Sequence, residues 1–157
     1  MDFYKIISKG YDGLYGEEQK IKVEAIKQNF NINKDDFLLD VGCGTGLSSD
    51  FNCKVIGIDP SMELIRQNNK DKIVARAENI PFRNKVFDKV ISVTSLHNFE
   101  SIGKGIREIK RVGKNHFAFS ILKKSKNFDL MEKEIKKNFK VRKMIDGRKD
   151  RILICTL

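Results

Sequence analysis

The sequence predicts an α/β fold in which helices alternate with the strands of a mostly parallel sheet and cover both of its faces. Three observations carry this prediction. Apolar, strand-like segments alternate along the chain with segments whose apolar residues recur at helical spacing. Glycines at alternate positions, Gly42, Gly44 and Gly46, directly follow a short apolar segment, as at a strand-to-helix turn. Near the end of the chain, Asp146-Gly147 separates two further strand-like segments, which predicts an antiparallel hairpin.

The helices are predicted from apolar periodicity and from capping side chains. Apolar residues fall on one helical face in residues 17–30, 102–112 and 127–139. Ser61 has the side chain of a helix N-cap, and a short helix is expected from there to residue 68.

The strands are predicted from short runs of apolar and β-branched residues bounded by turn-forming residues. They are residues 37–41, 54–58, 72–77, 86–94, 116–122, 139–145 and 151–156. Because the last two form a hairpin, we expect a mostly parallel seven-stranded sheet with an antiparallel C-terminal hairpin strand near its edge.

Length and composition indicate one globular domain over residues 1–157, with 40% hydrophobic and 33% charged residues. The longest apolar runs are far shorter than the roughly 18 residues that cross a bilayer. Residues 1–10 lack the apolar region of a secretory signal. Three cysteines and two histidines form neither a disulfide framework nor a zinc motif. We therefore expect a cytoplasmic protein with no metal site.

The positive charge is concentrated in the last third of the chain. The whole sequence has 31 Lys+Arg against 21 Asp+Glu, and residues 101–157 contain 17 of the former and 6 of the latter. Such an asymmetry is typical of a protein with an anionic partner, but it is also typical of a lysine-rich solvated face. The sequence leaves both readings open, because the basic residues follow no nucleic-acid-binding motif.

The glycine-rich turn is the strongest candidate for a ligand site. Gly42, Gly44 and Gly46 follow the apolar segment 37–41, and glycine alone combines positive φ with room for a ligand against the backbone. A Walker A reading fails because no Gly-Lys-Ser/Thr follows, and Leu47 takes the place of the third glycine of a dinucleotide fingerprint. The turn alone therefore indicates a nucleotide-like ligand without naming it.

Asp59 supplies the second half of the prediction. It ends the apolar segment 54–58, and in a doubly wound sheet the carboxyl end of the second strand lies beside the first glycine turn. A carboxylate there can accept hydrogen bonds from both ribose hydroxyls of a nucleoside. Asp59 and the glycine turn together predict a nucleoside-containing cofactor.

Six ordered segments resemble the class I S-adenosylmethionine (SAM)-dependent methyltransferases of the type 11 subgroup, which includes the quinone-biosynthesis methyltransferases. The segments are residues 11–16, 40–46, 59–62, 77–82, 87–98 and 106–112. The resemblance implies a Rossmann-like methyltransferase fold, SAM as the cofactor, and in-line transfer of its sulfonium methyl group. It also implies that residues 1–30 comprise a segment that covers the cofactor and a helix.

The resemblance further implies roles for individual residues. Asp40 would orient the glycine turn and the methionine amino group, Asp59 would hold the ribose, and Met62 would pack on the adenine. The other cofactor-binding residues that it implies are Tyr11, Tyr15, Gly42, Gly44, Gly46, Pro60, Ser61, Ala77, Glu78, Thr94 and Leu96. His97, as a general base, and Tyr15 are the candidate catalytic residues. Arg76 departs from the family pattern, since close relatives usually have an acidic residue there.

The methyl acceptor is not identified by the sequence. The type 11 resemblance favours a small molecule. The alternative is RNA or protein, because the chain has no room for the helical substrate lid of many relatives and its last third is basic. A nicotinamide-dependent oxidoreductase is disfavoured, since the segment 78–82 has no counterpart in that class.

Overall fold

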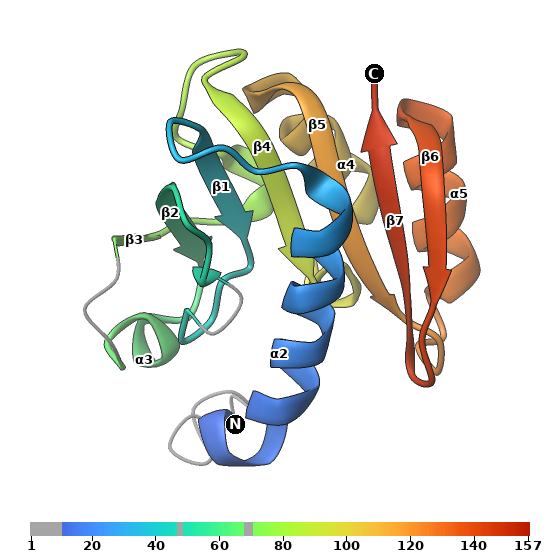
Figure 1. The fold of residues 1–157 in the computed structure, drawn as a ribbon, viewed down its shortest axis with the longest axis horizontal. Coiled ribbons are helices and arrows are strands. Elements are labelled where there is room, and N and C mark those ends of the chain that lie inside the picture. Colours follow the sequence, from blue (N-terminus) through green and yellow to red (C-terminus); the bar gives the residue numbers. More distant parts are fainter. Residues whose placement is uncertain (1–10, 47–48, 68–70) are drawn as a thin grey trace.

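A seven-stranded sheet forms the centre of the fold, in the order β3-β2-β1-β4-β5-β7-β6 (Figure 1). The computed structural model describes residues 11–46, 49–67 and 71–157, and for residues 11–15 the backbone alone. The strands are β1 (Phe37–Val41), β2 (Lys54–Asp59), β3 (Lys72–Val74), β4 (Phe87–Val93), β5 (Gly113–Leu122), β6 (Lys140–Asp146) and β7 (Asp150–Thr156). The first five pair in parallel, and β7 pairs antiparallel to both β5 and β6, which confirms the predicted sheet.

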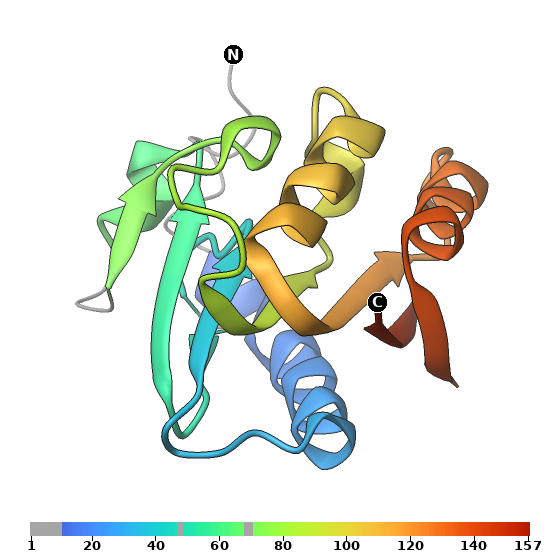
Figure 2. The same ribbon diagram turned by 90° about the horizontal axis from the view of Figure 1, so that it is seen from above.

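Helices cover both faces of this sheet. They are α2 (Tyr11–Phe30), α3 (Met62–Ile65), α4 (Ile102–Val112) and α5 (Phe128–Asn138), with short 3₁₀ turns η2 (Ala77–Asn79) and η3 (Leu96–Asn98). Figure 2 shows α2 on one face and both α4 and α5 on the other. Within the described residues, none of the helices combines the length and the apolar character needed to cross a membrane.

Two apolar layers hold the helices to the sheet, because successive side chains of a strand point to opposite faces. On one face Leu38 of β1 is buried together with Ile26 of α2. On the other face its neighbour Leu39 is buried in the cluster that contains Ile106 of α4 and Ile135 of α5. The alternation of apolar residues therefore fixes which helix lies over which face.

The predicted bounds differ most from the structure at α2, α3, β3 and β5. Helix α3 ends at Ile65 rather than at residue 68, and β3 ends at Val74 rather than at residue 77, which lies in η2. Helix α2 begins at Tyr11 rather than at residue 17, so residues 11–16 continue the helix. The glycines in this segment each cost about 1 kcal/mol in a helix, which a long helix packed on a sheet tolerates. Strand β5 begins at Gly113, because Phe87 of β4 pairs with it, although the polar residues 114–115 give no strand signal.

Candidate functional site

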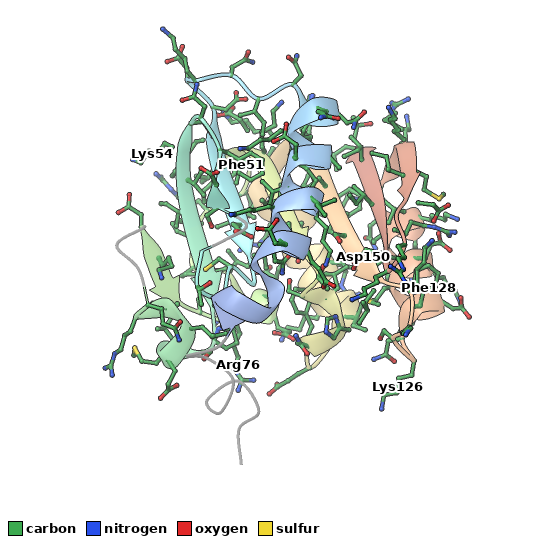
Figure 3. The ribbon with its side chains drawn as sticks, turned by 60° about the horizontal axis from the view of Figure 1, so that its bottom comes forward. Phe51, Lys54, Arg76, Lys126, Phe128 and Asp150 are labelled. Atoms are coloured by element: carbon green, nitrogen blue, oxygen red, sulfur yellow. The ribbon has the colours of Figure 1, made fainter. Side chains whose placement is uncertain are left out.

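A cavity of about 340 Å³ lies at the carboxyl ends of the parallel strands. Strand β1 is flanked there by β2 on one side and by β4 on the other, which is the position where doubly wound sheets bind ligands. The residues that line the cavity are Gly42, Gly44, Asp59, Pro60, Ser61, Leu64, Arg76, Ala77, Glu78, Thr94, Ser95, Asn98, Phe99 and Glu100. Figure 3 brings this end forward, with Arg76 on the β3 side, Asp150 beside α2, and Lys126 on the hairpin side.

The glycine turn forms the floor of the cavity. Gly42, Gly44 and Gly46 have φ angles of 78°, 54° and 94°, which side-chain-bearing residues rarely adopt. A Cβ atom on Gly42 would lie 2.3 Å from the Oγ atom of Ser95. The turn is tied to β2 because the N–H of Gly42 donates to the carbonyl oxygen of Ile58 at 2.8 Å. Glycine is therefore required here both by the backbone conformation and by the close approach of Ser95.

Asp59 connects the floor of the cavity to the wall that follows β2. Its Oδ2 accepts a hydrogen bond from the Gly44 N–H at 3.0 Å, and its Oδ1 accepts one from the Ser61 N–H at 2.8 Å. A carboxylate has about four lone-pair sites, so each oxygen has capacity to accept a further hydrogen bond. Burial raises the pKa of Asp59, and the two backbone N–H groups act against this rise. The arrangement suits a ligand that donates two hydroxyl groups.

The β3 side of the cavity is formed by the segment that precedes and includes η2. Ala77 and Glu78 line the cavity, and Glu78 Oε1 accepts a hydrogen bond from the Ser101 N–H at 3.1 Å. Arg76 forms an ion pair with Glu100 at the mouth of the cavity. The guanidinium of Arg76 is thereby already engaged with a carboxylate of this chain.

Two charged residues of α4 fasten the segment that follows η2. Glu108 Oε2 accepts a hydrogen bond from the Ile80 N–H at 3.0 Å. Arg111 donates to the carbonyl oxygens of Ile80 and Phe82 at 3.0 and 2.8 Å. The hydrogen bond from Arg111 holds the pKa of Glu108 below its usual value. The motif at residues 106–112 therefore has a structural role on the β3 side of the site.

The opposite wall is built around Thr94, directly after β4. Its φ is 51°, which is an outlier for a β-branched residue. Its Oγ1 accepts a hydrogen bond from Lys22 Nζ at 3.0 Å and lies 3.1 Å from the Oγ of Ser120. Lys22 also forms an ion pair with Asp150 at 2.9 Å, and the two side chains are only 12% and 6% exposed. Four segments distant in sequence thus meet at this wall.

The structure brings eight of the predicted cofactor-binding residues together at the cavity. They are Gly42, Gly44, Asp59, Pro60, Ser61, Ala77, Glu78 and Thr94. The predicted residues Asp40, Gly46, Met62 and Leu96 are not among those that line it. The side chains of Tyr11 and Tyr15 lie outside the described part of the chain, while their backbone belongs to α2.

Two of these four residues, Asp40 and Leu96, are buried instead of lining the cavity. Asp40 is fully buried, and its Oδ2 accepts a hydrogen bond from the Ser49 hydroxyl at 2.6 Å. Leu96 is also fully buried, whereas the Met62 side chain is 41% exposed on α3. Asp40 therefore fixes the segment after the glycine turn in this structure.

His97, the candidate general base, lies in η3 and is not among the residues that line the cavity. Burial lowers the pKa of its imidazole; nearby Asp150 acts against this and Lys22 adds to it. Its buried Nδ1 atom has no hydrogen-bond partner within the described residues. Burial thus favours the neutral form of the imidazole, but the geometry does not bring it to the cavity.

Sequence reasoning missed Lys22, Asp150 and Ser95. Ser95 could have been suspected from its place after an apolar strand, where its hydroxyl donates to the Val41 carbonyl oxygen at 3.0 Å. No local pattern distinguishes Lys22 or Asp150 from the other charged residues of their segments.

The cysteine beside the glycine turn is not a nucleophile in this structure. Cys43 is buried, and burial raises the pKa of its thiol, with the carboxylates of Asp40 and Asp59 adding to the rise. We therefore interpret Cys43 as a small packing residue. Among the described residues, no three His, Cys, Asp or Glu side chains are grouped so as to hold a metal ion.

The fold, the glycine turn and the acidic end of β2 define an α/β protein that binds a nucleoside-containing ligand at a strand-order switch point. Residues 39–119 match the family model described as a methyltransferase domain, and the chain belongs to this family. The prediction of an enzyme that uses SAM is thereby confirmed.

Two sequence relatives illustrate the family. An uncharacterized protein of Methanocaldococcus jannaschii is 32% identical over 169 residues, and the alignment covers 96% of this chain and 67% of that protein. The human protein named probable tRNA methyltransferase 9B is 34% identical over 82 residues, which cover 49% of this chain and 18% of that protein. The chain thus spans only part of each relative.

A solved structure shows the same fold over nearly the whole chain. The similar chain belongs to a complex between the Haloferax volcanii Trm112 methyltransferase activator and a methyltransferase. The TM-score is 0.83 at 12% identity, with 99% of this chain and 98% of that chain covered. At this identity the likeness shows the fold alone.

Proposed function

We propose that this methyltransferase transfers the methyl group of SAM to an acceptor in RNA. The proposal depends on a group of exposed cationic side chains, Lys124, Lys126 and Arg148, here called the basic rim. Within the described part of the chain, these three side chains have no carboxylate partner, whereas the adjacent Lys123 and Lys149 are paired with acidic residues. The rim is therefore free to bind phosphate groups.

The rim is one surface although it comes from two segments. The N–H of Lys123 donates to the carbonyl oxygen of Lys149 at 2.9 Å, and Lys123 Nζ donates to the carbonyl oxygen of Gly147 at 2.8 Å. These bonds join the loop after β5 to the turn between β6 and β7, at the lower end of the sheet in Figure 1.

The segment that carries Arg148 leads into a residue that contacts the cavity wall. Asp150 directly follows Lys149 and pairs with Leu122 in the β5–β7 ladder, and its Oδ1 lies 3.3 Å from the Oγ1 of Thr94 in the cavity wall. An RNA strand whose phosphate groups bind the rim would therefore extend toward the methyl donor.

The described residues fit SAM as the donor. The cavity has the size of a small-ligand site, and the glycine turn lets a ligand approach the backbone closely. We assign the two ribose hydroxyls to Asp59 and the adenine to the wall at Ala77 and Glu78. When bound, SAM supplies a methyl group on a positively charged sulfur, which an electron-rich acceptor atom can attack in line. The residues of this chain then align the reactants and exclude water, for which no catalytic triad is required.

The names of two relatives support an RNA acceptor. The human and Arabidopsis thaliana relatives are named as tRNA methyltransferases. A small-molecule acceptor, which the sequence alone favoured together with the quinone-biosynthesis subgroup, is the competing proposal. We likewise propose that residues 1–157 act as a single SAM-binding domain in the cytoplasm.

A labelled-methyl assay with SAM and fractionated extract tests the acceptor class. We expect label in the RNA fraction, and we expect RNA affinity to fall with salt. Each phosphate contact should contribute a slope of about 0.7 on single strands. Replacing the three rim residues by alanine should flatten this dependence by about 2 and abolish RNA labelling.

The matched control carries alanine at Lys133, Lys137 and Lys140, which removes the same charge from exposed positions on α5 and at the start of β6. The end of α5 and the start of β6 lie at the opposite end of the sheet from the turn between β6 and β7 (Figure 1). The control should bind RNA as the wild type does. Label confined to the small-molecule fraction, without salt-dependent RNA binding, would show that the proposal is wrong and that the rim is a solvated surface.

A further inference from the structure

The cavity wall at Thr94 is held by contacts that the glycine turn and Asp59 do not explain. Thr94 has a φ of 51°, a conformation that persists in a β-branched residue only when its surroundings impose it. Its N–H donates to the Ser120 carbonyl oxygen at 2.9 Å. Its hydroxyl contacts Lys22, Ser120 and Asp150 at 3.0, 3.1 and 3.3 Å. The backbone strain and the polar contacts occur at the same residue.

The ion pair that supplies two of these contacts is poorly explained by stability alone. Lys22 and Asp150 are nearly buried, and removing two charges from water costs about as much as their attraction returns. The same two segments are already joined at the surface by the exposed pair of Glu18 and Lys149. The buried pair therefore adds something that the exposed pair does not, namely the contact with Thr94.

The strand order determines which part of SAM meets this wall. With the ribose at Asp59 on β2 and the adenine at Ala77 and Glu78, which follow β3 in the chain, the remaining end of the cofactor extends across β1 toward β4. That end carries the amino-acid group. This step rests on the proposed placement of the ribose.

We propose that Lys22 and Asp150 are positioning residues, which hold Thr94 in its left-handed conformation so that the wall at the amino-acid end of SAM is preformed. Their effect reaches the cofactor through Thr94. Without the pair, Thr94 would relax, and only a fraction of the molecules would present the binding-competent wall. If that fraction falls to a tenth, the apparent affinity falls by about tenfold.

The test compares three ligands by calorimetric titration: SAM, S-adenosylhomocysteine and 5′-methylthioadenosine, which lacks the amino-acid end. We expect Lys22→Met to weaken the first two by about tenfold and to leave the third within about twofold. The double variant Lys22→Met/Asp150→Leu should behave in the same way. It replaces the pair by apolar residues, which proteins often tolerate without loss of stability, so it keeps the test valid if the single variant unfolds.

Two further variants separate positioning from other roles. Glu18→Gln breaks the exposed pair between the same segments and should change none of the three affinities. Thr94→Gly supplies a residue that adopts positive φ without strain, so Lys22→Met should have no further effect on SAM binding in that background.

Each remaining outcome is decisive. An equal loss of affinity for all three ligands would show that the pair supports the whole cavity. Unchanged SAM affinity in the folded double variant would show that the pair does not act on the cofactor. Either result overturns the proposal. A persisting effect of Lys22→Met in the Thr94→Gly background would overturn the role of Thr94. Failure of the wild-type protein to bind SAM would instead refute the cofactor assignment on which the proposal depends.

Discussion

Replacement of Asp59 by asparagine tests the assignment of the ribose most directly. In the structure each carboxylate oxygen accepts one backbone N–H, from Gly44 at 3.0 Å and from Ser61 at 2.8 Å. Asparagine keeps one acceptor oxygen and places an NH₂ group where the other oxygen was. One backbone N–H and one ribose hydroxyl then lose their acceptor, and the other two donors face a neutral oxygen instead of a charged one.

The magnitude follows from these lost contacts. A hydrogen bond to a charged group contributes about 1.5–3 kcal/mol, and a buried donor left without a partner costs about 1–3 kcal/mol. We therefore expect Asp59→Asn to weaken SAM binding by about 2–4 kcal/mol, roughly 30- to 1,000-fold in Kd. Calorimetric titration with SAM measures this change, and thermal unfolding checks that the variant is folded. Asp71→Asn, which removes the same charge from an exposed residue before β3, is the matched control.

The pH dependence gives an independent check on the same residue. Because burial raises the pKa of Asp59 above its ordinary value of 3.8, its carboxylate is protonated at a higher pH than an exposed aspartate. SAM affinity should then fall as the pH decreases through this raised pKa, and Asp59→Asn should remove that dependence. The free energy of unfolding depends on pH in the opposite direction. The stability that a raised carboxyl pKa contributes is present at low pH and is lost as the pH rises through the raised pKa. A folded Asp59→Asn protein with wild-type SAM affinity would refute the placement of the ribose.

Three further predictions concern the surroundings of the cofactor site. Gly42→Ala should abolish SAM binding in calorimetric titrations, because its Cβ would lie 2.3 Å from the Ser95 hydroxyl oxygen at a φ of 78°; retained binding would contradict the tight turn. Arg111→Lys should lower the free energy of unfolding, measured in urea, by about 1–3 kcal/mol, because lysine cannot reproduce the forked contacts of Arg111 with residues 80–84. An unchanged free energy of unfolding would show that these contacts are dispensable. Iodoacetamide at neutral pH should label Cys43 only after unfolding, because burial both shields the thiol and raises its pKa; rapid labelling of the native protein, detected by mass spectrometry, would contradict this.

The parts of the fold that depend on local patterns could be predicted from the sequence. Helix α4 has the bounds that its periodicity indicates, and Ser61 caps α3 as expected, accepting a hydrogen bond from the Leu64 N–H at 3.4 Å. The glycine turn and Asp59 could be found because a motif and its spacing encode them. The start of β5 could not, because Gly113 is placed in the sheet by pairing with β4 and not by its own strand propensity.

The other wall of the site depends on contacts that only the folded chain creates. Lys22 is one of several lysines on α2, and Asp150 is one of the charged residues around a hairpin turn. Neither has a spacing or a neighbour that marks it. Their meeting at Thr94 requires β7 to insert between β5 and β6, which the sequence predicted only as a hairpin near the edge of the sheet.

The insertion of β7 has a consequence for the order of assembly during synthesis. Strand β6 is made before β7 but pairs only with β7 in this sheet, so the observed pairing of β6 forms only after β7 has been made. A chain that ends at β6 also lacks Asp150 and therefore the complete support of Thr94. If Lys22 and Asp150 hold Thr94 as proposed, high-affinity binding of SAM requires β7 in the sheet, and the cofactor stabilises only molecules in which β7 has paired.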